Sequence, residues 1–125
     1  MYSPALFAHA SNPQNRGLLA DANAWGNSHY AECSDHFSLS LLIQDGVIVS
    51  AGYEAKACGP VIAFGSLATE AIVGLSVGEA LKLDAFHWDK LAGGLPPAKR
   101  HAILLFLDSL HQALTQLLNS KDKEG

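Results

Sequence analysis

Residues 36–56, HFSLSLLIQDGVIVSAGYEAK, decide the fold because two stretches of alternating apolar side chains flank an Asp-Gly pair. Alternation with a period of two predicts a β-strand with one face in the core, and it occurs over His36–Gln44 and Val47–Lys56. The inward-facing residues of the first strand are Phe37, Leu39, Leu41 and Ile43. We therefore expect an antiparallel hairpin with one buried face and one face that is partly exposed to solvent.

The turn between the two strands sets their register. A two-residue Asp45-Gly46 turn would pair Ile43 with Ile48 and would place the apolar row of the first strand opposite polar residues and glycine. A three-residue loop over Gln44–Gly46, ending in a bulge, pairs Ile43 with Val47 and matches apolar residues along the hairpin. The apolar pattern therefore predicts the three-residue loop.

Helical signals lie on both sides of this hairpin. A short helix over Pro4–Ala10 is expected to stop before the Asn-Pro turn signal that follows it. A second helix is expected to have Pro60 at a first helical position and Gly74 as its stop. Ser76, with Glu79 three residues later, predicts the capped start of another short helix.

The last long helix is expected to start at the segment LPPAKRHAI, residues 95–103, and to pack an apolar stripe on the sheet. The stripe consists of Ile103, Phe106, Leu107, Leu110, Leu114 and Leu117. Residues 18–32, LLADANAWGNSHYAE, have the mixed character of an edge strand and its loop. Together the elements predict an α+β fold, in which a small antiparallel sheet of about three strands has helices packed on one face. We expect a single domain over residues 1–119, followed by a polar C-terminal tail over residues 120–125.

Composition limits the possible classes of function. A chain of 125 residues with 49% apolar content is enough for one core. The net charge of −4, with eight scattered Lys and Arg residues, provides no basic stripe for nucleic acid. The sequence also lacks a targeting segment and an uninterrupted apolar run that would cross a membrane, so the expected location is cytoplasmic.

Two cysteines, one aspartate and one histidine occupy the ends of predicted elements. Cys33 and Asp35 precede the first hairpin strand, Cys58 precedes a helix, and His101 begins the last helix. If these ends converge, the four side chains would suit zinc or an iron–sulfur centre. Spacing alone is a weak signal because no CxxC pair is present. The cysteines could instead be inert buried thiols, Asp35 could cap a turn, and His101 could have only a structural role at a helix terminus.

Several linked motifs strengthen the metal hypothesis. Residues 2–17, YSPALFAHASNPQNRG, contain His9, Asn12, Pro13, Asn15 and Gly17 in the pattern H-x-x-N-P-R-N-x-G, with Gln14 in place of the arginine. Residues 20–35 match A-D-A…G…C-G-D, with Ser34 in place of the glycine, and residues 57–80 follow a G-C-G/A helix with an S-L-x-T-E stretch. In this order, over residues 2–119, the motifs resemble the IscU/NifU N-terminal family of iron–sulfur cluster assembly scaffolds.

This resemblance implies a non-enzymatic scaffold that binds a metal ion or a labile iron–sulfur cluster at one tip. It places Cys33, Asp35, Cys58 and His101 on the ligand positions, with a two-iron cluster or zinc as the bound group. The implied partners are a cysteine desulfurase, an Hsp70-type chaperone and apo iron–sulfur acceptor proteins. The chaperone motif L-P-P-x-K corresponds to Leu95, Pro96, Pro97, Ala98 and Lys99, although the two prolines would also serve as a stiff helix lead-in.

One position departs from the family pattern. The family's third cysteine, which binds the cluster and accepts sulfur, is replaced by Ala102, whose methyl side chain can do neither. Two other readings therefore stay open: a zinc-bearing, partner-binding paralogue that has lost cluster assembly, and a thiol enzyme using Cys58, His101 and Asp35 as nucleophile, base and orienter. The remaining histidines are interpreted as surface or packing residues, with His29 and His36 the candidates for supporting the ligands.

Overall fold

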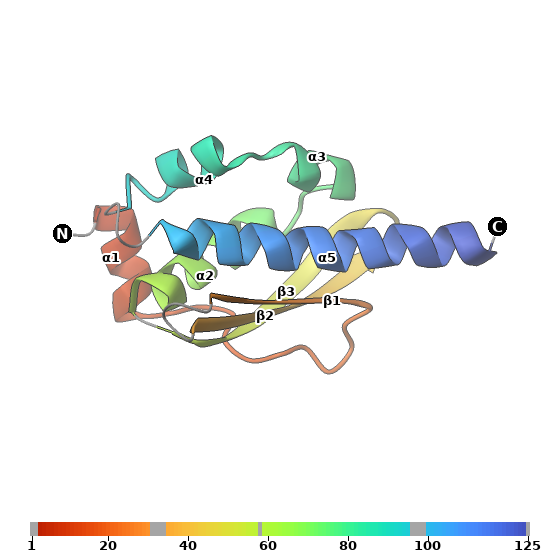
Figure 1. The fold of residues 1–125 in the computed structure, drawn as a ribbon, viewed down its shortest axis with the longest axis horizontal. Coiled ribbons are helices and arrows are strands. Elements are labelled where there is room, and N and C mark those ends of the chain that lie inside the picture. Colours follow the sequence, from red (N-terminus) through yellow and green to blue (C-terminus); the bar gives the residue numbers. More distant parts are fainter. Residues whose placement is uncertain (1–2, 31–34, 58, 96–99, 125) are drawn as a thin grey trace.

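The computed structural model of the protein describes residues 3–30, 35–57, 59–95 and 100–124. Figure 1 shows a small sheet crossed by one long helix, with shorter helices at the N-terminal end and on the side away from the sheet. The elements in chain order are α1 (Pro4–Ser11), β1 (Ala24–Tyr30), β2 (Asp35–Gln44), β3 (Val47–Lys56), α2 (Gly59–Ile72), α3 (Val77–Lys82), α4 (Ala85–Leu91) and α5 (His101–Glu124).

The strands form one antiparallel sheet in the order β1-β2-β3, with β1 as the expected edge strand. Helices α2 and α5 cover one face of this sheet (Figure 1). Helix α1 packs on α2, and α4 packs on α5. These observations confirm the predicted α+β fold. Within the described residues, no helix is long and apolar enough to cross a bilayer.

The predicted register of the β2–β3 hairpin is wrong. The turn has two residues, Asp45 and Gly46, with φ values of 54° and 78°. Gln44 consequently pairs with Val47 at the end of the hairpin. Positive φ at both central residues is typical of a type I′ turn, whose twist matches that of the flanking strands. Backbone twist therefore outweighs the apolar matching that favoured a three-residue loop.

A β-bulge reconciles this tight turn with an apolar core. The register shifts between Leu42 and Ile43 of β2, which leaves Val49 of β3 as the extra residue. Beyond the bulge, Leu39 pairs with Tyr53 on the buried face. The extra residue thus lies inside β3, not in the turn as predicted.

Aromatic side chains join the sheet to the helices above it. Phe37 of β2 stacks on Tyr53 of β3 with ring centroids 5.5 Å apart, and it meets Phe106 of α5 edge-on at 6.0 Å. Phe64 of α2 contacts Phe106 and also Trp88 of α4. All five rings are fully buried, so one aromatic cluster connects the sheet with α2, α4 and α5.

Tyr53 also connects β3 to α2 through a polar contact. Its hydroxyl donates a hydrogen bond of 2.7 Å to the carbonyl of Ile62. Burial raises the pKa of Tyr53 from 10.0 to about 12, and the nearby Arg16 guanidinium opposes this shift. Because the unfolded chain loses this proton first, the stability from the neutral phenol is present below about pH 10 and is lost as the pH rises toward 12.

The other face of the sheet is partly covered by the segment between α1 and β1. It first pairs with the edge of β3, where Tyr53 donates its amide proton to the carbonyl of Asn15 at 2.9 Å and its carbonyl accepts one from Gly17 at 2.7 Å. Farther along, the amide of Leu19 donates to Ser40 Oγ at 2.9 Å. This segment explains why residues such as Ser40 are buried although they face away from the helices.

The turn after α1 is fastened to α2 by the residues of the His-x-x-Asn-Pro motif. His9 Nδ1 lies 2.6 Å from Ser66 Oγ, and the same oxygen accepts the amide proton of Gln14 at 2.7 Å. Asn15 Nδ2 donates to Thr69 Oγ1 at 3.2 Å. His9 is thus a packing residue, as interpreted from the sequence.

The helices agree with the sequence analysis except at α4 and at the C-terminal end. The capping box of Ser76 and Glu79 is present at α3. Helix α4 was not predicted, although Asp84 accepts the amide proton of His87 as a standard N-cap. Helix α5 begins at His101, and the backbone of residues 120–124, which the sequence analysis assigned to a polar tail, continues this helix.

Helix α5 lies unusually close to β1 at Gly26. A Cβ atom at Gly26 would lie 1.8 Å from the carbonyl oxygen of Ser109, which is part of the α5 backbone. Two polar contacts accompany this approach: Ser28 Oγ donates to the carbonyl of Leu105 at 2.6 Å, and Ser28 Oγ lies 2.8 Å from Ser109 Oγ. Only glycine at position 26 leaves room for this packing.

We predict that Gly26→Ala lowers the free energy of unfolding by more than about 2 kcal/mol, because two backbones must separate to admit the methyl group. Gly78→Ala is the matched control, since Gly78 lies in α3 with nothing within 4 Å of the added Cβ. In the control, alanine should leave stability unchanged or raise it by up to about 1 kcal/mol. Urea unfolding of both variants measures the difference, and equal stabilities would contradict the close approach.

Candidate metal-binding site

Asp35 and His101 form a buried polar pair between the sheet and α5. His101 Nε2 lies 2.8 Å from Asp35 Oδ2, and the side chains are both 8% exposed. Asp35 is the first residue of β2 and His101 is the first residue of α5, although they are far apart in the sequence. The structure therefore brings together two of the four residues that the sequence analysis assigned to one site.

The packing of α5 along the sheet positions this pair. Ser109 Oγ donates to the carbonyl of Phe37 at 3.3 Å, and Ser28 Oγ donates to the carbonyl of Leu105 at 2.6 Å. These contacts fix the position of α5 along its own axis relative to β1 and β2. With that position set, the start of α5 meets the start of β2.

The remaining proposed site residues are the two cysteines and the segment Leu95–Lys99. Cys33, Cys58 and Pro96–Lys99 lie outside the described residues. Leu95 is buried, with 3% of its surface exposed, and Ala102 belongs to the core with 1% exposed. Among the residues that the structure describes, no group of three or more His, Cys, Asp or Glu residues could hold a metal ion.

His29 and His36 form a stacked pair on the face of the sheet opposite to Asp35. They are direct cross-strand partners, and their rings stack with centroids 5.2 Å apart. Adjacent residues of a strand point to opposite faces, so His36 points away from the buried side chain of Asp35. The suggestion that these two histidines support the ligands is therefore not favoured by the geometry.

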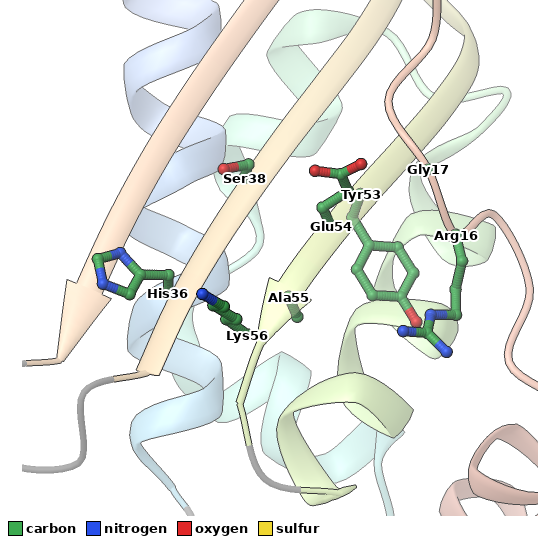
Figure 2. Close-up of a pocket in the computed structure, with 8 residues that line it drawn as sticks. All are labelled: Arg16, Gly17, His36, Ser38, Tyr53, Glu54, Ala55 and Lys56. Atoms are coloured by element: carbon green, nitrogen blue, oxygen red, sulfur yellow. The ribbon is translucent and has the colours of Figure 1, made fainter.

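Figure 2 shows the cavity that borders His36 on this face of the sheet. It has a volume of about 650 Å³ and is lined by residues that include Arg16, Glu54 and Lys56. The lining carries both signs of charge and has no described acidic or histidine cluster for a metal. The buried pair of Asp35 and His101 is thus the better candidate for the site.

The separation of the two donor atoms of this pair is that of a hydrogen bond, and it is also short enough for both atoms to reach one metal ion. Zinc–ligand bonds of about 2.0–2.1 Å in a tetrahedron place two donor atoms about 3.3 Å apart. The 2.8 Å separation of His101 Nε2 and Asp35 Oδ2 requires only a small outward movement to reach that value. Nitrogen and oxygen donors alone suit zinc, and two added thiolates would make the set suitable for an iron–sulfur cluster as well.

Comparison with known sequences decides the family. The model of the NifU-like N-terminal domain matches residues 1–124. The chain belongs to this family. The resemblance stated from the motifs of residues 2–119 is thereby confirmed.

Named relatives of this NifU-like domain are scaffold proteins. The chain is 32% identical over 123 residues to the iron–sulfur cluster assembly scaffold protein IscU 1 of Archaeoglobus fulgidus. The aligned region covers 98% of this chain and 80% of the relative. It is 34% identical over 119 residues to the scaffold protein IscU of Aquifex aeolicus, covering 94% of this chain and 76% of the relative.

Solved structures share the fold of this NifU-like domain. A putative iron–sulfur cluster assembly scaffold protein for the SUF system from Fervidobacterium islandicum superimposes with a TM-score of 0.74 at 20% identity, over 90% of this chain and 96% of that one. An N-terminal NifU-like protein from Brucella abortus gives 0.60 at 24% identity, over 88% and 76% of the two chains. At these identities the likeness supports the fold, including the three-stranded sheet with its helices.

The sequence analysis missed Asp89, a polar residue of the unpredicted helix α4. Its carboxylate accepts the amide proton of Leu95 at 3.1 Å and lies 3.8 Å from the guanidinium of Arg100. The available signal was Asp84, a good N-cap residue directly before the apolar residues of this helix. The short length of α4 hid its period among the surrounding turns.

Proposed function

We propose that the chain is a scaffold for iron–sulfur cluster assembly and holds its cargo, a two-iron cluster or a metal ion, with Cys33, Asp35, Cys58 and His101. Membership of the NifU-like N-terminal family supports the class of function. The buried contact between Asp35 and His101 carries the proposal for the site, because it joins two of the four residues from distant parts of the chain.

The sheet register supports a place for the cysteines beside this pair. His36 pairs with Lys56, so the chain leaves β3 next to the residue at which β2 begins. Cys33 is two residues from Asp35, and Cys58 is two residues from Lys56. An extended chain advances at most about 3.3–3.6 Å per residue, which limits how far either cysteine can lie from this edge.

The four residues have different roles in this proposal. Cys33 and Cys58 act as thiolate ligands, and Cys58 precedes the N-terminus of α2, where the helix dipole favours an anion. His101 binds as a neutral imidazole at the N-terminus of α5. Asp35 is a weaker, exchangeable oxygen ligand, and its exchange would ease the release of the cargo.

A scaffold needs donors of iron and sulfur and acceptors of the finished cluster. We propose a cysteine desulfurase as sulfur donor, apo iron–sulfur proteins as acceptors, and an Hsp70-type chaperone that binds Leu95–Lys99. The proposed compartment is the cytoplasm, where thiols stay reduced and available as ligands.

At Ala102 this chain departs from the family pattern, which has a third cysteine at this position. This alanine follows His101 directly in α5, and its methyl group is buried in the core. Alanine has no thiol, so residue 102 can neither receive sulfur nor bind iron. We therefore propose that the cluster is held with two thiolates, one imidazole and one carboxylate, a set expected to bind iron less firmly than three thiolates.

His101→Ala should shorten the lifetime of a reconstituted cluster at least about tenfold, as expected when a metal site loses a critical group. The matched control is His111→Ala, because His111 is an exposed histidine of the same helix. Anaerobic reconstitution followed by visible absorption, iron analysis and sulfide analysis measures the lifetime. A native lifetime in the His101 variant would contradict the proposed ligand set.

The same purification separates the alternatives. Visible charge-transfer absorption with iron and sulfide supports the scaffold. Stoichiometric colourless zinc supports the partner-binding paralogue, for which the short contact between Asp35 and His101 is equally suitable. A metal-free protein with one readily alkylated thiol supports a thiol enzyme that uses Cys58, and this outcome would contradict the scaffold proposal.

Ala102→Cys should lengthen the cluster lifetime and create a position onto which a cysteine desulfurase loads persulfide. The added sulfur enters a buried position, so we expect it to cost about 1–3 kcal/mol of stability. Ala113→Cys is the matched control because Ala113 is a fully buried alanine of the same helix, eleven positions from Ala102. Equal cluster lifetimes in the two variants and no persulfide at residue 102 would contradict a site beside His101.

A peptide spanning Leu95–Lys99 should bind the Hsp70-type chaperone of the source organism, since an extended Leu-Pro-Pro segment loses little entropy on binding. Replacing Pro96 and Pro97 together by alanine should weaken this binding. Fluorescence anisotropy of the labelled peptides measures both affinities. Equal affinities would mean that the two prolines only lead into α5.

A further inference from the structure

His29 and His36 place two imidazoles side by side on the face of the sheet away from the helices. They are cross-strand partners of β1 and β2, and their rings stack with centroids 5.2 Å apart and an interplanar angle of 18°. Both residues are exposed. Figure 2 shows the ring of His36 extending from β2 toward β1. A dissolved metal ion can therefore reach both rings at once.

The hydrogen bonds of β1 place this pair in the closer of the two classes of antiparallel pair. The amide of Asn27 donates to Gln112 Oε1 of α5 at 2.9 Å, so Asn27 directs its amide away from β2. His29 lies two residues farther along β1 and has the same backbone orientation, because that orientation alternates along a strand. His29 and His36 thus form a non-hydrogen-bonded pair, in which the side chains of two strands approach most closely.

The neighbouring pair of the same class shows how closely side chains meet on this face. Asn27 pairs with Ser38, and Ser38 Oγ donates a hydrogen bond of 2.6 Å to Asn27 Oδ1. Two imidazole nitrogens that bind one metal ion at about 2.0–2.1 Å in a tetrahedron lie about 3.3 Å apart. Because His29 and His36 are exposed, their rings can turn about the last side-chain torsion until one nitrogen of each reaches this separation.

We propose that His29 and His36 bind one divalent transition-metal ion of the copper, nickel or zinc type, each through one imidazole nitrogen. Neutral imidazole is a common ligand of these ions, and copper binds most firmly to a given set of ligands. Among the described residues no third His, Cys, Asp or Glu completes a metal site with the pair, so water fills the other positions. With two protein ligands the ion exchanges readily, unlike an ion in a closed structural site.

This site is independent of the proposed cluster ligands. Asp35 is buried on the helix side of the sheet, and His36, the next residue of β2, points to the opposite face. One ion therefore cannot bind Asp35 and the pair of histidines together. Binding at His29 and His36 stands or fails separately from the scaffold function.

Lys56 is the nearest cross-strand charge that opposes a cation at this place. It pairs with His36 from β3, which makes His29, His36 and Lys56 one row across the sheet. An anion such as inorganic phosphate is the rival occupant of this row. We favour the metal because His36 belongs to the closer class of pair with His29 and to the wider, hydrogen-bonded class with Lys56.

Titration of the full chain with copper(II), followed by electron paramagnetic resonance and calorimetry, tests the proposal. Cys33 and Cys58 are replaced by serine in every sample, because free thiols compete for the metal and are oxidised by copper(II). We expect a bound ion whose spectrum shows coupling to two nitrogen nuclei. His29→Asn and His36→Asn should each weaken binding at least about tenfold, because the second nitrogen then no longer binds intramolecularly.

Two comparisons locate the ion. His111→Asn is the matched control, because His111 is exposed and borders the same groove as His29 but lies on α5. This variant should keep the native affinity and both coupled nitrogens. The buried pair of Asp35 and His101 provides only one nitrogen, so the number of coupled nitrogens distinguishes binding there. Far-UV circular dichroism checks that each variant is folded.

Lys56→Gln separates the metal from the anion. Removing a positive charge beside His36 should tighten copper(II) binding, because like charges repel. Binding of inorganic phosphate that is lost in Lys56→Gln, with no two-nitrogen copper signal, would overturn the proposal and assign the row to an anion. A copper signal from a single nitrogen, or equal loss of binding in His111→Asn and His36→Asn, would also overturn it.

Discussion

The contact between the backbones of β1 and α5 at Gly26 is the constraint on which the rest of the structure depends. The carbonyl of Ser109 occupies the space that a side chain at residue 26 would fill, so α5 lies directly on the edge strand. This proximity lets Ser28 and Ser109 bond across the interface and fixes the helix along its own axis. The first residue of α5, His101, consequently reaches Asp35 at the start of β2.

The sequence predicted the fold well because its signals are local and repeated. Alternation identified β2 and β3, and caps or stop residues identified α1, α2 and α3. The hairpin register was wrong because apolar matching was considered without backbone twist, which selects the two-residue Asp45-Gly46 turn. Helix α4 was missed because seven residues are too few to show a clear helical period.

The candidate site was only partly predictable for a different reason. The position of Asp35 before a strand and of His101 at a helix start could be read from the sequence, and family motifs gave both a role. Their 2.8 Å contact depends on how α5 sits on the sheet, which is set by Gly26, and no local pattern encodes that placement. The bonds of Asp89 to Leu95 and Arg100 were equally hidden, because they require the unpredicted helix α4.

The central claim is that His101 binds the cargo directly through its imidazole. Pulsed electron paramagnetic resonance on the reduced, reconstituted protein tests it, with histidine labelled by nitrogen-15. We predict a strong nitrogen coupling from one histidine bound to iron, which disappears in His101→Ala and persists in His111→Ala. A cluster present in the native chain without that coupling, or a coupling unchanged by His101→Ala, would contradict the account.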